Sequence, residues 1–130
     1  MKILVGYDGS NPARNALNLA KKHALAFGAS VYVVYSIKKD SQTTPDAIEQ
    51  AQELLEYTKE VFSADKVPVE THLLVRGFTP GEDIVEFAKE HQVEEIVVGI
   101  KKTSPVGKMV FGSNARYVIL NAHCPVVTVK

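Results

Sequence analysis

The chain has no net charge, a single cysteine and no long apolar segment. Its 130 residues include 15 basic and 15 acidic side chains, so no global electrostatic attraction to nucleic acid or to an anionic membrane is expected. No apolar run approaches the length that spans a bilayer, and residues 1–8 lack the long apolar region of a signal peptide. Cys124 has no partner for an internal disulfide. These absences predict a cytoplasmic protein that contacts neither nucleic acid nor membrane.

Several motifs of catalytic and metal sites are also missing. The phosphate-binding loop G-x-x-x-x-G-K-S/T, the dinucleotide fingerprint G-x-G-x-x-G and the nucleophile elbow G-x-S-x-G do not occur. The four histidines lie in separate predicted elements, and no two of them have the spacing of metal ligands. We therefore assign no catalytic residue and no metal site.

Short apolar stretches rich in β-formers alternate along the chain with amphipathic helical patterns. The predicted strands cover residues 2–7, 31–37, 69–75, 95–99 and 125–129. The near-continuous apolar character of the first, second and fourth is typical of strands that are covered on both faces. The order predicts one α/β domain over residues 1–130, a doubly wound open sheet of five parallel strands with helices on both faces.

The helical patterns between the strands have recognisable ends. Thr44 precedes Pro45 as an N-cap, and Gly28 ends the first helix. Thr79 and Glu82 have the spacing of a capping box. The last helix is predicted to begin near Ser113 and to turn four residues inward, namely Ala115, Val118, Ile119 and Ala122.

Ligands of open parallel sheets bind beyond the carboxyl ends of the strands, where the strand order reverses. Residues 96–113 have the pattern of a phosphate site at such an edge. An apolar run ends at Gly99, a basic loop with Lys101, Lys102, Gly107 and Lys108 follows, and Gly112-Ser113 closes it where a helix begins. Free N–H groups and the dipole at a helix start favour an anion. The alternative is an ordinary strand-loop-helix connection with a solvated basic patch.

Asp8, at the end of the first predicted strand, has two interpretations. Asp8-Gly9-Ser10 is a good turn sequence, and Ser10 or Asn11 can cap the first helix. A carboxylate at this edge can also accept hydrogen bonds from a ribose or from the amino group of adenine. The residues alone leave both roles open.

Three parts of the chain resemble the universal stress protein family, and together they span nearly its whole length. They are Val5 to Ser10, the stretch Gly77-Phe78-Thr79-Pro80, and a closing third that includes Ile96 to Gly99, Gly112-Ser113 and Cys124 to Val129. The resemblance implies a strand order of 3-2-1-4-5. It also implies dimerisation, often through the last strand, and ATP binding in one subgroup of the family.

The ATP-binding subgroup has the pattern Gly, two residues, Gly, nine residues, Gly and then Ser or Thr. Gly99, Gly112 and Ser113 match it, but Lys102 replaces the middle glycine. A lysine there either blocks close approach of the backbone to the phosphates or adds a charge to them. The resemblance implies these roles: Asp8 contacts ribose or base, Ser36 and Val98 flank adenine, and Gly99, Gly112, Ser113 and Asn114 hold ribose and phosphates.

The resemblance to the ATP-binding subgroup, together with the lysine at position 102, leaves two alternative functions. The first is a cytoplasmic, homodimeric module that binds ATP, alone or with Mg, and regulates rather than catalyses, with slow hydrolysis at most. Its nucleotide contacts would include Lys102, Gly107 and Lys108. The alternative is a dimeric interaction protein of the same fold that binds no nucleotide.

Overall fold

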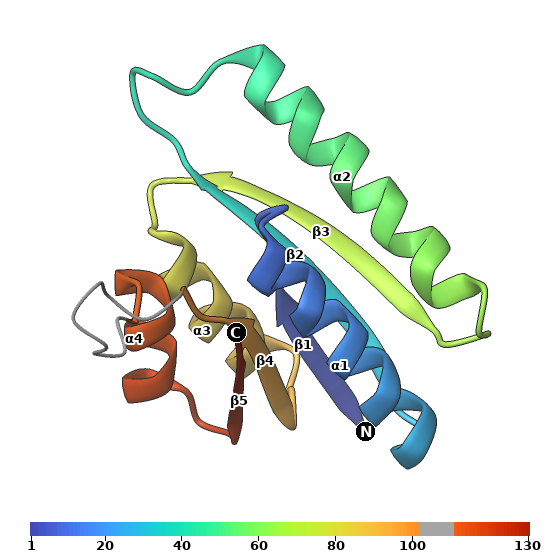
Figure 1. The fold of residues 1–130 in the computed structure, drawn as a ribbon. Coiled ribbons are helices and arrows are strands. Elements are labelled where there is room, and N and C mark those ends of the chain that lie inside the picture. Colours follow the sequence, from blue (N-terminus) through green and yellow to red (C-terminus); the bar gives the residue numbers. More distant parts are fainter. Residues whose placement is uncertain (102–110) are drawn as a thin grey trace.

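A computed structural model describes residues 1–101 and 111–130 (Figure 1). Strands and helices alternate along these residues as the sequence predicts. In chain order they are β1 (Lys2–Gly6), α1 (Asn11–Phe27), β2 (Ser30–Lys38), α2 (Pro45–Ser63), β3 (Val69–Arg76), α3 (Pro80–Glu90), β4 (Glu95–Gly99), α4 (Ser113–Asn121) and β5 (Val126–Val129). No helix in the described ranges is both long and apolar enough to cross a membrane.

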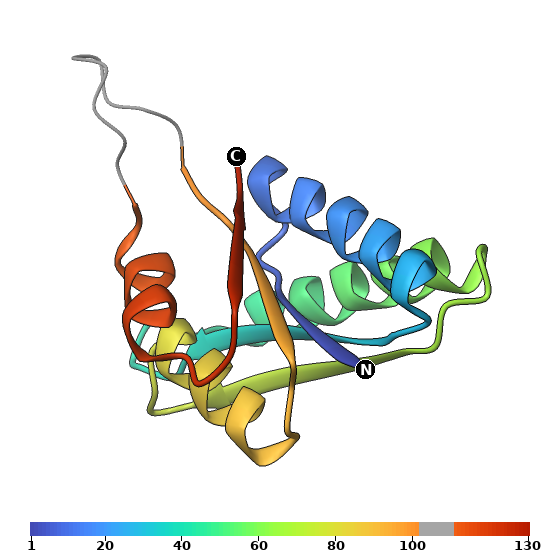
Figure 2. The ribbon, with the colours of Figure 1, turned by 90° about the horizontal axis from the view of Figure 1, so that it is seen from below.

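The strands form one parallel sheet in the order β3-β2-β1-β4-β5, which confirms the predicted topology. The register places Val5 beside Val33 of β2 and beside Val97 of β4. Helices α1 and α2 lie on one face of the sheet and α3 and α4 on the other (Figure 2). The strand order reverses between β1 and β4, so a crevice is expected at their carboxyl ends.

The central strands are buried on both faces, as their unbroken apolar runs predict. In β1, Ile3 and Val5 pack under α1 and α2, whereas Leu4 points to the opposite layer. In β4, Val97 packs in the layer of α1 and α2, and Ile96 packs in the opposite layer. Each fully buried aliphatic side chain contributes about 1.5–3 kcal/mol. The burial of β1 and β4, together with that of β2, therefore contributes much of the sheet's stability.

Side chains satisfy the first N–H groups of three helices. Ser10 accepts a hydrogen bond from the Ala13 N–H of α1, and Thr44 accepts one from the Ala47 N–H of α2. The predicted capping box of α3 is complete in both directions. Such caps contribute about 1 kcal/mol each. Helix α4 differs, because its N-cap residue is a glycine, Gly112, and no side chain caps the first turn of the helix with a hydrogen bond.

The expectation that Ile119 faces inward is wrong, because its side chain is 41% exposed. In α4, Ala115 and Val118 are buried and Ala122 packs beside them. These three follow steps of three and four residues, so they share one face of the helix. Ile119 directly follows Val118 and is rotated about 100° away from it.

Gly99 ends β4 against the first turn of α1, where no side chain fits. A Cβ atom at Gly99 would lie 2.5 Å from the carbonyl carbon of Pro12 and 2.7 Å from the amide nitrogen of Ala13. Both of these are backbone atoms, so they cannot move aside as a flexible side chain would. Glycine at this position allows the end of β4 and the start of α1 to pack in direct contact.

We expect Gly99→Ala to destabilise the protein, by about 1–3 kcal/mol or more, because the added methyl group must displace the α1 backbone. The matched control is Gly77→Ala, since a Cβ at Gly77 meets nothing within 4 Å. Thermal unfolding followed by circular dichroism measures both variants. Equal unfolding temperatures for Gly99→Ala and the unmodified chain would contradict this packing.

Candidate functional site

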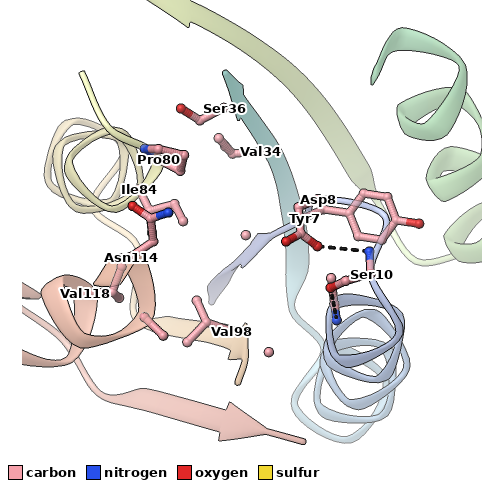
Figure 3. A pocket seen from close by; sticks show the side chains of 14 residues that line it. Tyr7, Asp8, Ser10, Val34, Ser36, Pro80, Ile84, Val98, Asn114 and Val118 are labelled. Atoms are coloured by element: carbon pink, nitrogen blue, oxygen red, sulfur yellow. Dashed lines mark hydrogen bonds between the residues drawn. The ribbon is translucent and has the colours of Figure 1, made fainter. Parts of the chain in front are cut away.

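A pocket opens at the carboxyl ends of β1, β2 and β4, between the first turns of α1, α3 and α4 (Figure 3). Its volume is about 130 Å³, whereas a single buried water needs roughly 10–15 Å³. The lining residues are Gly6, Tyr7, Asp8, Ser10, Ala13, Val34, Ser36, Pro80, Ile84, Val98, Gly99, Asn114, Ala115 and Val118. The pocket therefore lies where the strand order reverses and has room for a ligand.

One part of the pocket wall is apolar, and each of its side chains comes from a different element. Val34 of β2, Ile84 of α3, Val98 of β4 and Val118 of α4 line it, and each is less than a tenth exposed. In Figure 3 these side chains surround a common space. Rigid aliphatic walls of this kind suit a flat, weakly polar ring. The structure places Val98, which the sequence predicted as a site residue, in this wall.

Asp8 takes part in a turn and also lines the pocket. Its Oδ1 accepts a hydrogen bond from the Ser10 N–H at 3.0 Å, which fixes the carboxylate just beyond β1. The Asp8 residue remains exposed. Tyr35 donates to the Asp8 carbonyl oxygen at 3.5 Å, and burial, followed by the negative charge of Asp8, raises the pKa of the Tyr35 phenol. A neutral phenol thus lies beside a carboxylate that can accept further hydrogen bonds from a ligand.

Ser36 lines the β2 side of the pocket and is bound to a buried acid. Its hydroxyl donates to Asp83 Oδ2 at 2.5 Å, and Arg76 Nε donates to Asp83 Oδ1 at 2.7 Å. The Asp83 side chain is completely buried. A carboxylate so buried is stable only when it is paired and hydrogen-bonded. Here Arg76 provides the charge, and Ser36 provides the second hydrogen bond.

Sequence reasoning missed Asp83 and Arg76 as parts of this site. The available signal was the position of Asp83 four residues before Phe87, on the apolar face of α3. An acid on a buried helix face requires a partner, and the sequence alone does not identify it. Arg76 lies seven residues earlier, at the end of β3, with its guanidinium carbon 5.5 Å from the centre of the Phe78 ring.

Asn114 connects the starts of α3 and α4 beside the pocket. Its Oδ1 accepts a hydrogen bond from the Gly81 N–H at 3.0 Å, one of the N–H groups in the first turn of α3. The Asn114 side-chain oxygen is thereby occupied. The Nδ2 group, with two hydrogens, remains as the donor that this side chain can offer to a ligand.

A second cavity adjoins the pocket and extends to the start of α4. Five residues line both, namely Asp8, Ser10, Gly99, Asn114 and Ala115. The second cavity is also lined by Lys101, Gly112 and Ser113. The uncapped first turn of α4 and the Lys101 ammonium favour an anion here.

The structure brings the predicted residues together at this double cavity. Ser36 and Val98 line the first part, Gly112 and Ser113 the second, and Asp8, Gly99 and Asn114 both. Lys102, Gly107 and Lys108 lie outside the described residues. Among residues 1–101 and 111–130, no group of three or more His, Cys, Asp or Glu side chains is arranged to hold a metal ion.

Comparisons with known proteins agree with this architecture. The model of the universal stress protein family matches residues 1–130. A universal stress protein of Thermus aquaticus is 34% identical over 98% of this chain and 97% of its own length. The structure of a universal stress protein from Archaeoglobus fulgidus is 42% identical with a TM-score of 0.91, covering 100% of this chain and 98% of that one.

A second structure from Archaeoglobus fulgidus, a universal stress protein in complex with dAMP, is 38% identical with a TM-score of 0.85. It covers 100% of this chain and 98% of its own. The matches extend from end to end and include the closing third that carries the glycine pattern. The chain belongs to the universal stress protein family.

Proposed function

We propose that this protein binds an adenine nucleotide, with ATP as the expected ligand, alone or with Mg. The observation that carries the proposal is the double cavity, in which an apolar pocket for a flat ring adjoins an uncapped helix start for an anion. A relative that is 38% identical, with 98% of its own chain matched, forms a complex with dAMP. Its ligand combines an adenine ring with a phosphate, the same two chemistries that the double cavity suits.

In the proposed complex the base lies among Val34, Ile84, Val98 and Val118. Asp8 stands where the two cavities meet, and its carboxylate accepts hydrogen bonds from the ribose or the base. The phosphates extend toward Lys101, Gly112 and Ser113, where the α4 dipole adds about 0.3–2 kcal/mol of favourable energy. Lys102, Gly107 and Lys108 are proposed from the sequence as further phosphate contacts.

The proposed role is regulatory rather than catalytic. The double cavity offers acceptors, a helix start and a lysine, but we assign no side chain in it as general base or nucleophile. ATP hydrolysis is therefore expected to be slow at most. The second candidate function is a dimeric interaction protein without a nucleotide, in which Lys102 occupies the place of the motif glycine. The cytoplasmic setting stays a prediction from the sequence.

We expect Ser113→Glu to lower the affinity for ATP by about tenfold or more, because its carboxylate repels the phosphates with an energy of about 1.4 kcal/mol or more. Affinity for adenosine, which has no phosphate, should be unchanged. The fold should be unharmed, since an acidic residue in the first turn of a helix is favourable. Isothermal titration calorimetry measures both ligands.

The matched control is Gln52→Glu, which adds the same charge at an exposed position on α2. It should bind ATP as the unmodified chain does. If Ser113→Glu and the unmodified chain bind ATP with equal affinity, the phosphates do not lie at the start of α4.

We also propose that two copies of the chain pair through β5. This strand is at one end of the strand order, so one of its sides has no partner strand among the described residues. The carbonyls of Pro125 and Val129 accept hydrogen bonds from the N–H groups of Ile96 and Ile100, on the β4 side. Because successive residues of a strand point in opposite directions, the N–H groups of Val126 and Thr128 face the open side. An exposed edge of this kind invites pairing with a second copy.

We expect Thr128→Pro to give a monomer, because proline removes one outward N–H group and leaves the hydrogen bonds to β4 in place. The control, Thr128→Ser, keeps this N–H group and should stay dimeric. Sedimentation equilibrium distinguishes the 14.2 kDa chain from a species of twice that mass. A dimer of unchanged affinity in Thr128→Pro would rule out pairing through this edge.

A further inference from the structure

We infer that Asp83, held by Arg76, turns Ser36 into a hydrogen-bond acceptor toward the pocket, and that this selects a base with an amino group over one with a carbonyl. Adenine and hypoxanthine differ in this respect, since the first has an amino group where the second has a carbonyl oxygen. The inference rests on the proposed nucleotide site and adds two residues, Asp83 and Arg76, that determine which base it accepts.

The direction of the Ser36 hydroxyl is fixed by chemistry. A serine has one hydrogen to donate, and that of Ser36 is engaged by Asp83 Oδ2 at 2.5 Å. Asp83 acts as the acceptor in both of its contacts, because Arg76 Nε donates to its Oδ1 at 2.7 Å and the guanidinium pairs with the carboxylate. Asp83 is also completely buried, so water does not compete for the bond.

Ser36 therefore has only lone pairs to offer a ligand. Figure 3 shows its side chain at the β2 wall of the pocket, with the oxygen on the side of α3. Asp8, at the end of β1, is an acceptor as well, whereas Asn114 on α4 offers its Nδ2 hydrogens. The side of the pocket formed by β1 and β2 thus suits the amino group at position 6 of adenine, whereas hypoxanthine has a carbonyl oxygen at position 6 and its only donor on that edge is the neighbouring N1–H. A carbonyl oxygen there would face acceptors and be left unpaired.

The variant Asp83→Asn tests this arrangement, because it reverses the direction of the hydrogen bond between residue 83 and Ser36. The amide oxygen of the introduced asparagine still accepts from Arg76, so its amide nitrogen faces Ser36 and donates to the serine oxygen. The Ser36 hydrogen is then released and can point into the pocket as a donor. Selectivity should shift from the amino base toward the carbonyl base, which a merely loosened structure would not produce.

The experiment is calorimetric titration of AMP and IMP, which share ribose and phosphate and differ in the base. The unmodified chain should bind AMP about 10- to 100-fold more tightly than IMP, as expected for one unpaired polar group. Asp83→Asn should reduce this ratio at least tenfold, with IMP gaining affinity. The control Glu86→Gln removes the same charge at an exposed position on α3 and should keep the ratio.

Ser36→Ala provides a second test that leaves Asp83 and Arg76 intact. It should bring the ratio of the affinities for AMP and IMP close to one. If circular dichroism shows that Asp83→Asn does not fold, Ser36→Ala alone tests the inference. Equal binding of AMP and IMP by the unmodified chain would overturn this inference and leave the proposed function standing. If Asp83→Asn loses affinity for AMP and for IMP by equal factors, the inference is likewise overturned and the proposed function stands. Failure of the unmodified chain to bind AMP, IMP or ATP would overturn both.

Discussion

The reversal of strand order between β1 and β4 is the constraint on which the rest of this structure depends. From β1 the chain crosses to α1 on one face of the sheet, and from β4 it leads to α4 on the other. The two helices start on opposite faces, so no helix or strand among residues 1–101 and 111–130 fills the space above the strand ends. The absence of a side chain at Gly99 lets β4 end directly against α1. The pocket is thus a consequence of the topology, and the lining side chains give it its chemistry.

Those side chains give the two cavities different characters. Aliphatic residues from four elements make the first suitable for a ring, and the uncapped start of α4 makes the second suitable for an anion. Asp8 and Asn114 lie where the two meet, and each has one hydrogen bond that fixes its orientation. A ligand with a ring and a phosphate meets groups that are already in position, so little ordering is required when it binds.

Much of this could be predicted from the sequence, because the relevant signals are local. Several features depend only on residues a few positions apart. They are the apolar runs of β1 and β4, the capping box at Thr79 and the C-terminal cap of α1 at Gly28. Long-range pairings could not be predicted in this way. The bond from Ser36 to Asp83 joins residues 47 positions apart, and the bond from Gly81 to Asn114 joins residues 33 apart. The exposure of Ile119 was mispredicted because its neighbour Val118 occupies the buried face of α4.

The most direct test of the central claim is a titration of the ¹⁵N-labelled protein with AMP, followed by two-dimensional NMR. The account predicts that the largest amide shifts occur at the pocket, at Gly6, Gly99 and Ala115, and that they saturate together. Amides at the opposite ends of the strands, such as that of Ala29 just before β2, should shift little. Saturable shifts that fall elsewhere, or the absence of any shift at millimolar AMP, would contradict it.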